Sequence, residues 1–128
     1  FRPPKVGHDN WVSMASGPFG YYAISFAAGD RLRAEVYLDT GQQSSTKALF
    51  DALHQDKATI EEAMQQELSW ERLDDKRASR IAAYMPAPDL AVEQESDAAK
   101  AWAAQIVLRF IQTLDDRLRQ EARAFRAT

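Results

Sequence analysis

The segment from residue 70 to residue 84 combines basic and aromatic side chains, a combination that can bind nucleic acid. Its members are Trp70, Arg72, Lys76, Arg77, Arg80 and Tyr84. Arginine and lysine pair with phosphates, and aromatic rings stack on bases, so such a group is typical of a nucleic-acid or phosphopeptide surface. Arg33 and Tyr37 lie on the polar side of an earlier predicted strand, and they join this surface if the two strands share one face.

Acidic residues in the same segments support a second interpretation, an ordinary solvated face. Glu35, Glu71, Asp74 and Asp75 nearly cancel the positive charge, and ion pairs between neighbouring strands use the same side chains. A long cationic chain can also cover an apolar surface while its head group pairs with an acid such as Glu71 or Asp39. The residues that carry both interpretations are Arg33, Tyr37, Trp70, Arg72, Lys76, Arg77 and Arg80.

Asp74-Asp75-Lys76 has the form Asp-x-Lys that is found in many metal-dependent nucleases. Such a site needs a second carboxylate from a preceding strand to hold Mg²⁺, and Glu35 is the candidate for it. The Pro-Asp pair that usually opens this pattern is missing upstream. A charged turn between two strands accounts for these residues more simply, so we predict no catalytic residue here.

Other catalytic and cofactor patterns are weak or missing. His8 and His54 are the only histidines and the chain has no cysteine, which leaves little for a metal site. The serines lack the Gly-x-Ser-x-Gly context of a nucleophile. The segment Ser16-Gly17-Pro18-Phe19-Gly20 has no lysine in the place that a phosphate loop requires. We therefore predict no catalytic residue, metal or cofactor, and no enzymatic activity in this chain itself.

Composition places the chain among globular domains of ordinary size. It has 128 residues, of which 45% are hydrophobic and 27% charged, and this length favours one domain over residues 1–128. The formal net charge is −3, which excludes a globally basic protein that coats nucleic acid. No apolar run approaches the roughly 18 residues that a membrane span needs, and we expect a cytoplasmic protein. Because the first residue is Phe1, we expect a C-terminal domain excised from a longer protein.

Alternating apolar and polar residues predict an antiparallel sheet in the first third of the chain. Residues 1–10 are predicted as an extended lead-in, residues 11–15 as a first strand and residues 16–20 as a turn. Residues 21–26 alternate as a second strand, and Gly29-Asp30 predicts a hairpin turn. In the third strand the apolar side chains point one way and the polar ones the other. Its apolar side chains are Leu32, Ala34, Val36 and Leu38.

Helical spacing of apolar residues begins after Gly41 and predicts one helix over residues 45–65. Residues 68–73 and 79–84 are predicted as two further strands, and residues 92–125 as a long final helix. Its apolar stripe is either packed on the sheet, which we favour, or a seam for a partner. The order βββ-α-ββ-α predicts an α+β domain, with a five-stranded antiparallel sheet covered by two helices.

Several aromatic, apolar and charged residues follow one another in a characteristic order along the chain. They are Trp11, Tyr37-Leu38, Lys47, Phe50, Leu53, Lys57, Ile60-Glu61, Leu68, Trp70-Glu71, Leu73, Lys76 and Ala78-Ser79-Arg80-Ile81. This order resembles a bacterial family known as domain of unknown function 4268. The resemblance covers about residues 7–84, and the final helix fits in position only. The tryptophan-proline segment expected before that helix is missing from residues 86–96.

The resemblance implies a context and not a mechanism. Members look like C-terminal domains of prokaryotic proteins whose N-terminal part is similar to a restriction-type or Holliday-junction-type nuclease. We therefore expect a non-catalytic accessory domain of a bacterial nuclease-like protein, of the restriction, DNA-processing or phage-defence kind. Its expected partner is nucleic acid or a nuclease domain of the same chain. The alternative is a protein-interaction or homodimerisation domain that uses the final helix or an open sheet edge.

Overall fold

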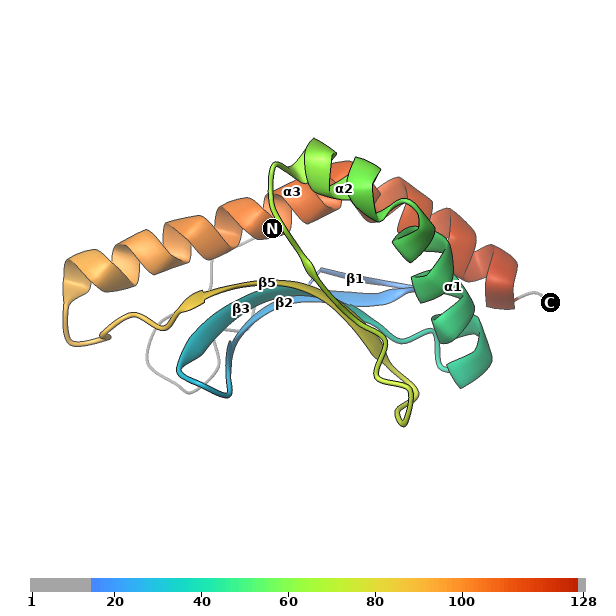
Figure 1. Cartoon of the computed structure of the whole chain (residues 1–128), viewed down its shortest axis with the longest axis horizontal. Helices are drawn as coiled ribbons and strands as arrows, with labels where there is room; N and C mark the ends of the chain where they lie inside the picture. The colour runs from blue at the N-terminus through green and yellow to red at the C-terminus, as the bar shows by residue number, and fades with distance from the viewer. Residues whose placement is uncertain (1–14, 127–128) are drawn as a thin grey trace.

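Five strands form one antiparallel sheet in the computed structural model, which describes residues 15–126 (Figure 1). They are β1 (Ala15–Gly17), β2 (Gly20–Ala27), β3 (Arg31–Leu38), β4 (Ser69–Glu71) and β5 (Ser79–Pro86). The order across the sheet is β1-β2-β3-β5-β4, so β5 lies beside β3 and the two short strands form the edges. The predicted α+β class and five-stranded sheet are confirmed. The lead-in over residues 1–10 and most of the predicted first strand lie outside the described residues.

The turns follow from residues that accept a left-handed backbone. Gly29 and Asp30 have φ angles of 79° and 53°. They lie in a three-residue loop, residues 28–30, because Ala27 and Arg31 already pair in the sheet, and short hairpin loops need such positive values to reverse the chain. This confirms the predicted turn between β2 and β3. The turn before β2 is shorter than predicted, because Ser16 and Gly17 already pair with Tyr21 and Gly20 in the sheet.

The predicted single helix over residues 45–65 is wrong, because the chain divides it into two. α1 (Gln43–Gln55) and α2 (Lys57–Met64) meet at Asp56, whose N–H bonds to the carbonyl of Leu53, three residues back. Arg117 of the last helix, α3 (Glu93–Arg126), contacts the chain just before this break and at it. Its guanidinium donates to the Ala52 carbonyl at 3.1 Å and lies 2.8 Å from the Asp56 carboxylate. The sheet is therefore covered by three helices and not by two.

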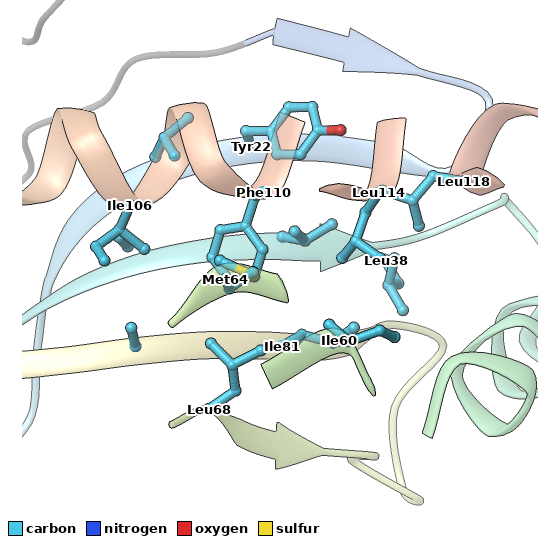
Figure 2. Packing of buried hydrophobic residues seen from close by; sticks show 14 of the residues in the cluster. Tyr22, Leu38, Ile60, Met64, Leu68, Ile81, Ile106, Phe110, Leu114 and Leu118 are labelled. Carbon is cyan, nitrogen blue, oxygen red and sulfur yellow. The ribbon is translucent and has the colours of Figure 1, made fainter. Parts of the chain in front are cut away.

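All three helices lie on one side of the sheet, and α3 runs across it (Figure 1). Figure 2 shows Phe110 and Leu114 of α3 directed at the sheet, with Met64 of α2 beside Phe110. The apolar stripe of α3 is buried there, which confirms that it packs within the chain. The largest buried side chains include Tyr22, Ile24, Leu32, Leu38, Met64, Ile81, Phe110 and Leu114. Within the described residues, no helix combines the length and apolar character that crossing a membrane requires.

A polar chain joins α3 to the first two strands at the side of this core. The buried Tyr22 hydroxyl donates to the Asp115 carboxylate at 2.8 Å, and Arg119 donates to the other oxygen of Asp115 at 2.9 Å. Arg119 also reaches the carbonyl of Ser16 in β1 at 3.3 Å. Burial raises the pKa of Tyr22, and the acceptor Asp115 raises it further, so the phenol keeps its proton.

Gly20 is required where β1 turns into β2, and Gly41 offers a matched control. Both have positive φ angles, 127° and 91°. A Cβ atom at Gly20 falls 2.0 Å from the Tyr37 carbonyl oxygen, whereas one at Gly41 meets nothing within 4 Å. Gly20→Ala therefore adds a backbone clash to the strain that both positions share.

We expect Gly41→Ala to lower the free energy of unfolding by about 1 kcal/mol, the cost of strain at positive φ. Gly20→Ala is expected to cost at least about 3 kcal/mol or to prevent folding, because the clashing atom belongs to the backbone of β3. Urea denaturation of both variants measures the difference. Equal losses at the two positions contradict the register of β2 on β3.

Candidate functional site

The side of the sheet opposite the helices is covered by no helix or strand of residues 15–126 (Figure 1). We call this side the open face. The register places on it the odd-numbered residues of β2, β3 and β4 and the even-numbered residues of β5. Its polar and aromatic members are Ser16 of β1, which pairs with Tyr21, and Tyr21, Ser25, Arg31, Arg33, Glu35, Tyr37, Ser69, Glu71, Arg80 and Tyr84.

Glu35 lies at the centre of the open face, held between two arginines. Its carboxylate accepts from Arg33 at 2.5 Å and from Arg80 at 3.1 Å. The Ser25 hydroxyl donates to Glu35 at 3.4 Å and accepts from Arg33 at 3.1 Å. Although no helix covers it, Glu35 is only 3% exposed. The side chains on both sides therefore bury the central carboxylate.

Glu71 extends this network toward the β4 edge. It accepts from Arg80 at 3.1 Å and from the Tyr84 hydroxyl at 2.5 Å. Burial acts to raise the pKa of Glu71, but the hydrogen bonds from Tyr84 and Arg80 outweigh it and hold the pKa below the ordinary value. Burial and the acceptor Glu71 raise the pKa of Tyr84. At neutral pH the network therefore holds charged Glu71 and a protonated tyrosine.

Aromatic rings stand beside the guanidinium groups of the open face. The Tyr21 and Tyr37 rings stack with centroids 5.0 Å apart, and Arg80 lies over Tyr37 at 5.6 Å from the ring centroid. Arg31 lies over Tyr84 at 4.0 Å, close enough for an attraction between cation and ring. The predicted common face of Arg33, Tyr37, Arg80 and Tyr84 is therefore formed, and the ion pairs of the alternative interpretation are formed on it as well.

Trp70 lies on the helical side of the sheet, away from Arg33, Tyr37 and Arg80. It pairs with Ile81 in the sheet, and its indole N–H donates to Glu61 of α2 at 3.1 Å. Its ring packs edge-on against those of Phe50 and His54 of α1. The strand period separates Trp70 from the open face, because neighbouring residues of a strand point to opposite sides.

The basic residues of the β4–β5 connection mostly bind acids of the same chain. Arg72 donates twice to Asp51 of α1, at 2.9 and 3.0 Å, and also bonds to Asp74. Arg77 donates twice to Asp39, at 2.9 and 2.8 Å. The Lys76 side chain is exposed in the turn. These residues lie in the connection between β4 and β5, outside the strand residues that make up the open face.

The carboxylates of the nuclease hypothesis are not brought together. Asp74 lies in the β4–β5 connection and binds Arg72, whereas Glu35 lies in mid-strand opposite Ala82. Among residues 15–126, no three side chains of the metal-binding types are grouped so that they can hold an ion.

A buried lysine, known from the sequence only for its place in the family pattern, holds the β4–β5 hairpin together. The Lys47 ammonium group donates to the carbonyls of Arg72, Leu73 and Ala78 at 2.5, 2.8 and 2.7 Å, and to the Ser79 hydroxyl at 3.0 Å. Leu73 has a φ of 55°, a left-handed conformation that costs energy for this residue type. Burial lowers the pKa of Lys47, and the nearby Arg72 lowers it further. The feature of the sequence that could have indicated this role is the position of Lys47, a cation three residues before Phe50 on the apolar stripe of a helix.

We expect Lys47→Met to destabilise the domain by about 3 kcal/mol or more. Methionine retains the length of the chain but takes the ammonium donor from all three carbonyls. The Arg72 and Leu73 carbonyls keep one bond each, from the Ser79 hydroxyl and the Lys76 N–H, and a buried polar group that loses its partner costs roughly 1–3 kcal/mol. Lys57→Met is the matched control, because Lys57 is exposed at the start of α2, and it is expected to change stability by less than about 0.5 kcal/mol. Urea denaturation compares the two variants. Similar small effects of both contradict a structural role for Lys47.

Glu71 generates a pH dependence of known sign. Because its folded-state pKa lies below its ordinary value of 4.5, its contribution is complete above that value and is lost as the pH falls through the folded-state pKa. Glu71→Gln is therefore expected to lower the free energy of unfolding by about 1–2 kcal/mol at pH 7. The gap between wild type and variant should narrow below about pH 4.5. A gap that persists unchanged at pH 3 contradicts the ion pair.

Residues 1–118 of this chain match the family described as Domain of unknown function (DUF4268). The match runs beyond residues 7–84, where the resemblance was expected, and includes most of α3. Neither a curated protein nor a solved structure matches the chain. Because the match covers all but the last ten residues, the chain belongs to the DUF4268 family.

Proposed function

We propose that this domain is a non-catalytic accessory module of a bacterial nuclease-like, DNA-processing protein, and that it contacts nucleic acid through the open face. The observation that carries the contact is the gathering of tyrosine and arginine side chains on a sheet face that the helices leave uncovered. The family resemblance supports the nuclease-like context, since members look like C-terminal domains of such proteins.

The residue types of the open face support a nucleic-acid ligand. Three of the four tyrosines of the chain lie there, and the fourth, Tyr22, is in the core. Sheet faces that carry aromatic rings bind nucleic acid by stacking, while nearby cations hold the backbone. Tyr37 and Tyr84 each lie against a guanidinium group, so both kinds of contact are available at the same points.

The charge of the open face also favours an anionic partner. Its strand residues include three arginines, Arg31, Arg33 and Arg80, and two carboxylates, Glu35 and Glu71. The difference is one positive charge, whereas the chain as a whole carries −3. The open face therefore attracts a phosphate backbone, although the chain as a whole is acidic.

The state of the carboxylates supports a binding role over a catalytic one. A general base works best when its pKa lies near the operating pH. Glu71 has a lowered pKa, and both oxygens of Glu35 accept hydrogen bonds from arginines. Both carboxylates hold arginine side chains in position, and the lowered pKa of Glu71 makes it a poor proton acceptor at neutral pH.

The final helix, the first surface considered for dimerisation, has its apolar stripe covered by the chain itself. The stripe on α3 that suggested a partner seam packs on the sheet of the same chain. The large apolar side chains that are exposed among residues 15–126 are Leu90, Val92 and Leu108, a smaller set than a stable dimer interface buries.

A titration of labelled DNA tests the proposed contact. We expect a rise in fluorescence anisotropy at roughly 50 mM salt that weakens at roughly 200 mM, because bound phosphates release counterions. Arg31→Ala is expected to weaken binding several-fold and to reduce the salt slope by about one. Arg31 is the informative variant, since its side chain donates to the Ala28 carbonyl and lies over the Tyr84 ring but pairs with no carboxylate of residues 15–126. Arg77 and Arg80, in contrast, each form ion pairs that join separate parts of the fold.

Arg123→Ala supplies the control. It removes the same charge from an exposed position of α3, on the helical side of the sheet, and should leave affinity unchanged. Circular dichroism checks that both variants are folded. A flat titration at low salt with single-stranded and duplex DNA overturns the proposal, and so does an equal loss in the two variants.

A further inference from the structure

Resting on the proposed function, we infer that the nucleic acid on the open face is single-stranded. Its bases stack on Tyr37 and Tyr84, and one of its phosphates binds Arg31. The positions of the two rings, the pairing of the arginines and the small excess of charge carry this inference.

The two rings stand apart along the open face. In the β3–β5 ladder Tyr37 lies opposite Arg80 and Tyr84 lies opposite Arg33. The rings are thus four residues apart along the strands, about 13 Å. Both side chains are half-buried, so each keeps an accessible part. Two separated rings on a sheet provide two places at which unpaired bases can stack.

Each ring is held in place before a ligand arrives. Tyr37 is stacked on Tyr21 and has Arg80 beside it. Tyr84 is held by its hydroxyl, which donates to Glu71, and by Arg31, which lies over one face of its ring. Side chains that are already ordered lose less conformational entropy on binding, which favours stacking at these two points.

The arginines of the open face are mostly occupied, which disfavours a duplex. Glu35 neutralises Arg33, and Glu35 and Glu71 share Arg80. Within the described residues, Arg31 is the cation of this face that bonds to a carbonyl and not to a carboxylate.

A duplex offers this face little to bind. Its bases are stacked on one another, so it presents phosphates and groove edges. The affinity that phosphates contribute rises with the number that the protein neutralises, and one available arginine contributes little. Stacking must therefore supply most of the free energy of binding, and only unpaired bases can stack on Tyr37 and Tyr84.

Three labelled ligands of equal length, about 12 nucleotides, test this inference by anisotropy. They are a single strand of mixed sequence, its duplex, and a single strand in which the internal positions are abasic. We expect the intact single strand to bind at least roughly 10-fold more tightly than the other two. The abasic strand retains every internal phosphate, so it separates stacking from charge.

Variants of the two rings provide the second arm. Tyr37→Leu and Tyr84→Leu are each expected to weaken binding of the single strand by roughly 5- to 150-fold, the range for loss of one stacked base. Tyr37→Phe and Tyr84→Phe retain the ring and should bind within about 2-fold of wild type. Circular dichroism and thermal unfolding identify any variant that is misfolded. If a leucine variant is misfolded, the test uses the phenylalanine variants, whose affinity for the intact single strand is compared with their affinity for the abasic strand.

The outcomes separate the inference from the proposed function. If the duplex or the abasic strand binds as tightly as the intact strand, single-strand stacking is overturned and a nucleic-acid contact stands. If none of the three ligands binds at low salt, both proposals fall.

Discussion

The packing of α3 on one face of the sheet is the contact on which the rest of the structure depends. Phe110, Leu114 and Leu118 are fully or almost fully buried in it, and each such side chain contributes roughly 1.5–3 kcal/mol. Because this one layer buries the apolar residues of β2, β3 and β5, the other side of the sheet is free of the need to be apolar. The same contact therefore makes a core on one side and permits a charged surface on the other.

Cations hold the other elements to this two-layer arrangement by binding backbone carbonyls. Lys47 donates hydrogen bonds to three carbonyls of the β4–β5 connection. Arg117 donates to a carbonyl near the end of α1, where the helix breaks. Arg119 reaches β1 from α3. Turns and helix ends leave carbonyls without partners, and long cationic side chains satisfy them from a distance. Lys47, Arg117 and Arg119 are therefore used to hold elements of the same chain together.

The open face uses the same chemistry for a different result. Its guanidinium groups meet carboxylates and rings, so the side chains are ordered while their charges are largely cancelled. Burying Glu35 in such a network costs desolvation free energy that close ion pairs offset only in part. Under the proposed function, the ordered rings contribute more to binding than an excess of charge does.

The class of fold and the two faces of each strand can be predicted from the order of residues alone. The two-residue period of β3 and the helical spacing of apolar residues in α3 predict which side chains are buried, because burial follows the local periodicity of each element. The hairpin at Gly29 and Asp30 is predicted equally well, since few residue types accept positive φ.

The features that depend on contacts between residues far apart in the sequence could not be predicted, because only folding brings those residues together. Arg117 accompanies the break at Asp56 from sixty-one residues away, Lys47 finds its acceptors across the hairpin, and the register sends Trp70 to the opposite side from Arg80. Whether a cation binds a ligand or its own chain is a question of three-dimensional neighbours, and only the folded chain brings those neighbours together.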